Sequence, residues 1–93
     1  MSLKKIREIR NEEVGKDPNS LKAKVLTRFL MQPMTISNPS SKRVPVNFSN
    51  PQHRETFMGS VNRDIENGVV LSHPQKRAEI ENYIAEARRI LFS

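Results

Sequence analysis

Few residues in this chain have both the type and the spacing that catalysis or metal binding requires. The segment His53-Arg54-Glu55 matches the His-x-Glu part of a zinc deaminase signature, but the completing Cys-x-x-Cys is absent because the 93 residues include no cysteine. Neither His53 nor His73 has a second ligand four positions away, as a pair of zinc ligands on one helix needs. We therefore predict no enzymatic activity, no metal and no cofactor.

A glycine beside a lysine, as in the phosphate-binding loop of nucleotide hydrolases, also occurs at Gly15-Lys16-Asp17. That loop needs an upstream glycine and a serine or threonine directly after the lysine, and this sequence has neither. The segment is therefore interpreted as a turn between two helices.

Basic side chains are the strongest chemical feature of the sequence, which has a formal net charge of +6 at pH 7. Residues 1–28 contain eight of the 16 Lys and Arg but only four of the 10 Asp and Glu, and residues 33–50 add two cations and no acid. A positive field attracts nucleic acid, anionic lipid or an acidic protein surface. We predict that nucleic acid is contacted, mainly at its phosphates, by the following basic residues: Lys4, Lys5, Arg7, Arg10, Lys22, Lys24, Arg28, Lys42 and Arg43.

Three other binding modes are less well supported. The break at residues 15–20 is long for a helix-turn-helix motif, and the chain has no strand rich in aromatic residues on which bases could stack. The basic first helix could lie on a membrane surface, but Arg10 and Glu13 interrupt its apolar face, so insertion would be shallow.

Residues 33–50 are rich in proline, serine and asparagine and contain a degenerate repeat, in which residues 34–45 resemble residues 46–57. Each proline lacks an N–H group and restricts the residue before it, so we predict an extended strap in place of a helix or central strand. In a structural explanation of the repeat, each Asn-Pro pair starts a helical turn. In a functional explanation, Ile36 and Phe48 are equivalent apolar contacts for a protein partner.

Apolar residues at helical spacing predict two helices before the strap. The first follows Ser2 as its N-cap and buries Leu3, Ile6, Ile9 and Val14. The second is capped by Asn19 or Ser20, ends before Pro33, and has on its apolar side Leu21, Val25, Leu26, Phe29 and Leu30.

Two more helices are predicted after the strap. Asn50 caps the third, which has Pro51 in its first turn, and Asn67-Gly68 supplies a left-handed stop. Its apolar stripe is Phe57, Met58, Val61 and Ile65. Residues 69–71 form a short extended piece or an apolar plug, and Ser72 and Gln75 form a capping box for the last helix. That helix has the most regular stripe in the chain: Ile80, Tyr83, Ile84, Ala87, Ile90 and Leu91.

The predicted fold is thus a single all-α domain over residues 1–93, with three to four helices. It comprises a basic helical pair (1–32), the strap (33–50) and a second helical pair (51–93). No apolar run approaches the roughly 20 residues that span a bilayer, so we expect no transmembrane segment. The charged start, followed by no apolar stretch, does not resemble a secretory signal, and the absence of cysteine suits a reducing, cytoplasmic location.

The function predicted from these features is that of a small basic accessory protein bound to nucleic acid or to a nucleoprotein assembly. The alternative is a protein–protein adaptor or structural subunit that docks through the 33–50 strap and apolar helix faces. In either case the chain could be a homo-oligomer or part of a larger assembly, and its partner is nucleic acid or an acidic protein surface.

Overall fold

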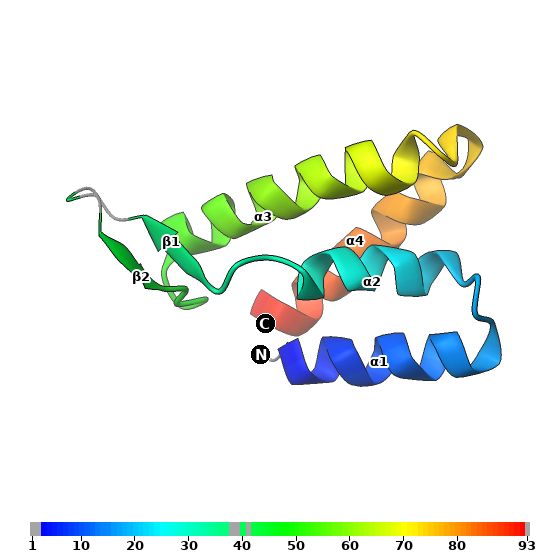
Figure 1. Ribbon diagram of the computed structural model, residues 1–93, viewed down its shortest axis with the longest axis horizontal. Coiled ribbons are helices and arrows are strands. Elements are labelled where there is room, and N and C mark those ends of the chain that lie inside the picture. The colour runs from blue at the N-terminus through cyan, green and yellow to red at the C-terminus, as the bar shows by residue number, and fades with distance from the viewer. Residues whose placement is uncertain (1–2, 38–39, 41, 93) are drawn as a thin grey trace.

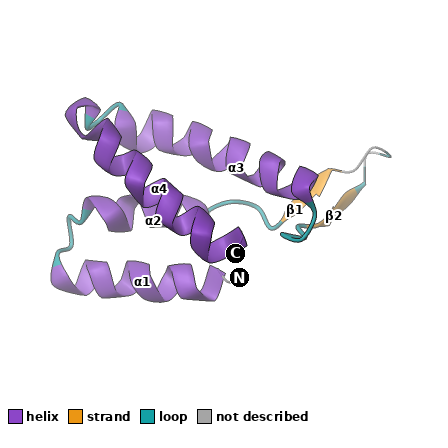
Figure 2. Cartoon of the chain, turned by 180° about the vertical axis from the view of Figure 1, so that it is seen from behind, coloured by secondary structure: helices purple, strands orange, loops and turns teal. Residues whose placement is uncertain are grey.

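The computed structural model describes residues 3–37, 40 and 42–92, and these confirm the predicted helical class (Figure 1). The elements, in chain order, are α1 (Leu3–Lys16), α2 (Leu21–Leu30), β1 (Thr35–Ser37), β2 (Arg43–Pro45), α3 (Pro51–Ile65), the π-helical turn η1 (Glu66–Val70), the 3₁₀ turn η2 (Pro74–Lys76) and α4 (Arg77–Phe92). Helices α1 and α2 form an antiparallel pair, and α3 and α4 diverge from the η1–η2 turn (Figure 2). The second helix packs against the other three, so it is the centre of the domain.

Side chains cap the two helices whose starts were predicted most specifically. The Oγ atom of Ser20 accepts a hydrogen bond from the backbone N–H of Ala23 at 3.1 Å, so Ser20 is the cap of α2. The Oδ1 atom of Asn50 accepts from the N–H groups of Gln52 and His53, and Pro51 occupies the first turn, where no donor is needed. The predicted caps Ser2 and Asn38-Pro39 lie outside the described residues.

The core is built from the predicted stripes. The largest fully buried side chains come from all four helices and from η1: Phe29, Ile6, Ile65, Ile80, Leu91, Val25, Val61 and Val69. On α1 the stripe is only partly correct, because Val14 is 41% exposed while Ile6 is fully buried. This helix has one completely buried residue, and the partly buried Leu3 and Ile9 complete its apolar contact with the rest of the core.

The strap is extended, as predicted, and pairs with itself as an antiparallel hairpin in which Ile36 lies opposite Val44. The N–H of Val46 donates to the carbonyl of Met34 at 2.9 Å, which continues the register by one hydrogen-bonded pair. In an antiparallel ladder such pairs alternate with non-hydrogen-bonded ones. Pro45 therefore occupies a position that needs no N–H, and the hairpin accommodates it without losing a ladder bond.

The predicted stop at Asn67-Gly68 is wrong. The chain continues helically through η1, where the N–H of Leu71 donates to the carbonyl of Glu66 at 3.1 Å, and Gly68 does not adopt a left-handed conformation. The wider π turn directs Val69 and Val70 into the core as an apolar plug, whereas Leu71, the third residue of that predicted segment, is 67% exposed. The predicted capping box is also wrong, because η2 begins after His73 without a side-chain cap.

None of the helices in the described part of the chain is long and apolar enough to span a membrane. The molecule measures 43 × 25 × 19 Å, and its long axis reflects the hairpin, which projects beyond one end of the helices (Figure 1). The basic residues of the hairpin are thereby separated from the π turn at the other end.

Candidate anion-binding groove

Lys24 and Arg28 lie one turn apart on α2 and line a groove between this helix and the η1–η2 turn. They face this groove because the other side of α2 carries the buried Val25 and Phe29. The groove has a volume of about 460 Å³, and its remaining lining is Thr27, Met31, Gly68, Val69, Ser72 and His73. It thus combines two cations with hydroxyl groups and an apolar wall.

The charges of Lys24 and Arg28 are not compensated by any side chain in the described part of the chain. Neither side chain forms a hydrogen bond or an ion pair with any residue in the described part of the chain. Two cations at this spacing repel each other and attract an anion. The groove is therefore electrostatically suited to a phosphate or carboxylate group.

Arg10 on α1 adds a third cation at the edge of the groove. Its Nη1 donates to Thr27 Oγ1 at 3.4 Å and its Nε donates to Asn11 Oδ1 at 2.8 Å, so both recorded partners are neutral. Thr27 itself lines the groove and donates to the carbonyl of Ala23 at 2.8 Å. Through Thr27 the structure brings together Arg10, Lys24 and Arg28, three of the nine predicted nucleic-acid contacts.

Lys22 is on α2 as well, but it is not part of this group. Its Nζ lies 3.1 Å from Glu86 Oε2 and donates to Glu86 Oε1 at 3.2 Å, which connects α2 to α4 and neutralises the lysine locally. The sequence could not show this pair, because its members are 64 positions apart.

The remaining predicted contacts form two further groups. Lys4, Lys5 and Arg7 are exposed on the first turns of α1, and Arg7 precedes Arg10 by one turn. Lys42 and Arg43 are exposed on the hairpin, at the other end of the molecule from η1 (Figure 1). The nine residues thus do not form one compact patch.

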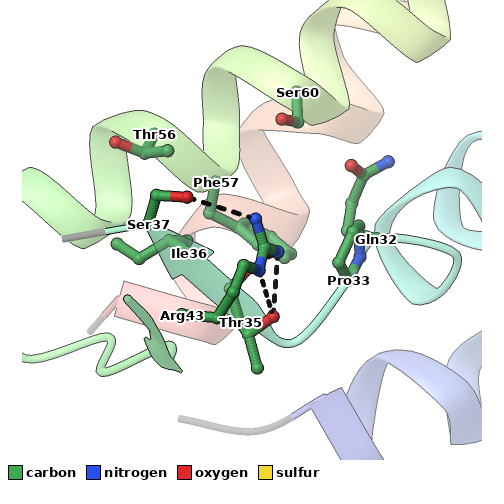
Figure 3. Close-up of a pocket in the computed structure, with 9 residues that line it drawn as sticks. All are labelled: Gln32, Pro33, Thr35, Ile36, Ser37, Arg43, Thr56, Phe57 and Ser60. Atoms are coloured by element: carbon green, nitrogen blue, oxygen red, sulfur yellow. Dashed lines mark hydrogen bonds between the residues drawn. The ribbon is translucent and has the colours of Figure 1, made fainter. Parts of the chain in front are cut away.

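Arg43 lies over a second groove, of about 310 Å³, between the hairpin and α3 (Figure 3). Its Nη2 donates to the carbonyl of Thr35 at 2.6 Å and to Thr35 Oγ1 at 2.8 Å, and Nη1 donates to Ser37 Oγ at 3.5 Å. These neutral partners hold the guanidinium against β1 without cancelling its charge.

The two predicted partner contacts of the strap have different environments. Ile36 is half-buried and lines the hairpin groove (Figure 3). Phe48 is only 8% exposed and packs edge-on against Phe57 and Phe92, with ring centroids 5.0 and 5.7 Å apart. Ile36 is accessible to a partner, whereas Phe48 is part of the core.

The sequence did not identify the far wall of the anion-binding groove. From the sequence, Gly68 is predicted to end a helix, His73 has no second metal ligand, and Met31 has no predicted role. In the structure His73 Nδ1 lies 3.0 Å from the carbonyl of Val69, and Met31 is 61% exposed. A methionine one turn after Arg28 and two turns after Lys24 was the available signal, but its significance depends on the position of η1.

No group of three or more His, Cys, Asp or Glu residues able to hold a metal ion occurs among the described residues. In the comparisons with known proteins, no family model, no curated protein and no solved structure matches this chain.

Proposed function

We propose that the protein is a non-enzymatic basic accessory protein that binds nucleic acid, alone or within a nucleoprotein assembly, mainly through its phosphates. The observation that carries this proposal is that Lys24 and Arg28 line one groove, beside which Arg10 contacts Thr27, without an acidic partner for these cations among the described residues. Phosphate groups satisfy such cations by charge and by hydrogen bonding, and guanidinium groups bind them at two points. The cytoplasm is the proposed location, since the chain is free of cysteine.

The other exposed cations extend the proposed contact. Arg7 continues the row from Arg10 along α1, towards Lys4 and Lys5. A nucleic-acid strand longer than the groove reaches these residues, and a strand that spans the molecule also reaches Lys42 and Arg43. Contacts of this kind position a backbone but read little sequence, so binding with low sequence preference is expected.

Fluorescence anisotropy with a labelled oligonucleotide tests the proposal. Neutralising about three phosphates at the groove gives a log–log salt slope of about −2 to −3, which is a loss of roughly 15- to 65-fold between 50 and 200 mM salt. Lys24→Glu is expected to weaken binding and to reduce the magnitude of the slope by about 1.

Arg63→Glu is the matched control, because it makes the same charge change at an exposed helical position on α3, outside the groove. Equal weakening by both variants would indicate a general effect of net charge, and a flat salt dependence would falsify the proposal. Strong competition by an acidic protein, without any affinity for nucleic acid, would identify an acidic protein surface as the partner.

One observation favours the alternative function, that of an adaptor docking through the strap. The hairpin projects from the helices and forms with α3 a groove lined by Ile36 and Phe57 (Figure 3). An apolar side chain from a partner protein would fit between hairpin and helix. Ile36→Ser is expected to abolish such docking and leave oligonucleotide binding unchanged.

A further inference from the structure

The guanidinium group of Arg28 lies face-on against the backbone of Gly68. A Cβ atom built on Gly68 would be 2.5, 2.7 and 3.2 Å from Nη2, Cζ and Nε. These three distances are similar, as expected for a Cβ that lies above the plane of the guanidinium. A Cβ in that plane would lie much nearer to one nitrogen than to Cζ. Gly68 thus covers one face of the guanidinium, and any larger residue would displace it.

Gly68 accounts for one face of this guanidinium, and the second face is the one on which another planar group would stack. The Arg28 side chain lies on Gly68 and makes no hydrogen bond or ion pair with the described residues. Arginine planes and aromatic rings are the surfaces on which proteins stack unpaired bases. The groove beside Arg28 also has apolar walls in Met31 and Val69, and the ring of His73 borders it.

We infer that this groove seats one unstacked base of a single-stranded nucleic acid, with the base on the guanidinium face of Arg28 and a neighbouring phosphate at Lys24. The inference rests on the proposed function and names its substrate class, single strands in preference to duplexes. A volume of about 460 Å³ is within the roughly 300–1,000 Å³ of small-ligand sites. The bases of a duplex remain stacked on each other, so they cannot enter such a groove.

Three probes of about twelve units separate base stacking from charge. They are a thymidine oligonucleotide, an oligonucleotide of equal length in which every base is replaced by hydrogen, and a duplex. The first two carry equal charge, so their difference in affinity measures the contribution of bases. At about 50 mM salt we expect the thymidine probe to bind about 5- to 150-fold tighter than the abasic one, the value of stacking one base.

Arg28→Lys is the decisive variant, because it retains the charge and removes the plane. It is expected to reduce the ratio between the thymidine and abasic probes to near 1, with the salt slope unchanged. Gly68→Ala provides a second variant, since the new methyl group displaces the guanidinium from its position while the arginine remains. Lys24→Ala is the control and should weaken both probes equally. Circular dichroism verifies that each variant is folded.

The outcomes distinguish the inference from the proposed function. A ratio near 1 for the wild-type protein, with the expected salt slope, overturns base stacking and leaves phosphate binding intact. The duplex binding tightest, or polyglutamate competing as well as the thymidine probe, also overturns the inference, because neither offers an unpaired base. No binding to any probe at low salt overturns both.

Discussion

The amide of Gln32 joins two helices by donating to the Asp64 carboxylate: its Nε2 lies 2.6 Å from Asp64 Oδ2 on α3. The same nitrogen donates to the carbonyl of Arg28 at 3.0 Å, near the end of α2. Gln32 is 8% exposed, so water does not replace these bonds easily. One amide thereby satisfies an unpaired helix-end carbonyl and fixes the spacing of α2 and α3.

Gln32→Ala should therefore destabilise the domain. The substitution leaves the Arg28 carbonyl and the Asp64 carboxylate without this partner, which costs about 1–3 kcal/mol. For a domain of this size the expected fall in Tm is roughly 4–8 °C per kcal/mol, measured by thermal unfolding at a helical circular dichroism band. Gln52→Ala, at an exposed position on α3, is the control and should change Tm little. Equal Tm values for the two variants would contradict the structural role of Gln32.

Phe48→Ala is expected to have a larger effect, although it changes a residue of the strap. The Phe48 ring contacts Phe57 on α3 and Phe92 on α4, so it fastens the hairpin to both helices. Removing a buried phenylalanine side chain costs about 3–5 kcal/mol. Urea unfolding should show a lower midpoint with a similar slope. Ile36→Ala, which changes a half-buried residue, should cost clearly less. Comparable losses would mean that the hairpin is not anchored through Phe48.

Helices were predictable here because apolar spacing and capping residues act locally. Leu21 to Leu30 carry their own periodicity, and Asn50-Pro51 marks a helix start whatever the remainder of the chain does. The course of the chain at Gly68 depends on distant contacts. Burial of Val69 and Val70, and the space that Arg28 needs over Gly68, favour a π turn where the local sequence favours a stop.

For the charged residues, too, the local sequence does not determine the environment in the fold. Lys22 and Lys24 have nearly identical local sequence environments, yet Glu86 neutralises Lys22 while Lys24 faces the groove. Only the packing of α4 on α2 distinguishes them. The sequence therefore predicts which side chains are cationic, and the tertiary structure decides which of them remain available to a phosphate.

Gly59→Ala is expected to stabilise the protein. Gly59 lies in the middle of α3, is exposed, and a Cβ built on it meets nothing within 4 Å. Alanine in a helix interior is favoured over glycine by roughly 0.5–1 kcal/mol. Thermal unfolding should show a Tm increase of several degrees, and the reciprocal change Ala85→Gly, on the exposed side of α4, should lower Tm. A lower Tm for Gly59→Ala would show that α3 needs glycine at this position, because a methyl group there would disturb a contact with atoms beyond the described residues.

Tyr83 gives the protein a pH dependence in the alkaline range. Burial raises the pKa of the Tyr83 phenol, and the neighbouring Glu79 carboxylate raises it further, while Lys22 opposes the shift. Between the unfolded pKa of about 10 and the higher folded value, the folded state binds more protons than the unfolded state. The contribution of this group to stability is therefore fully present below about pH 10 and is lost as pH rises through the folded pKa.

Tyr83 is the only tyrosine and the chain has no tryptophan, so tyrosinate absorbance in the near ultraviolet reports this one group. The titration midpoint of the native protein should lie above that of the protein unfolded in guanidinium chloride. Glu79→Gln should move the native midpoint down, because it removes a negative charge that opposes ionisation. Coinciding native and unfolded midpoints would mean that the tyrosine is solvated, and hence that the contact between α4 and the α1–α2 pair is looser than described.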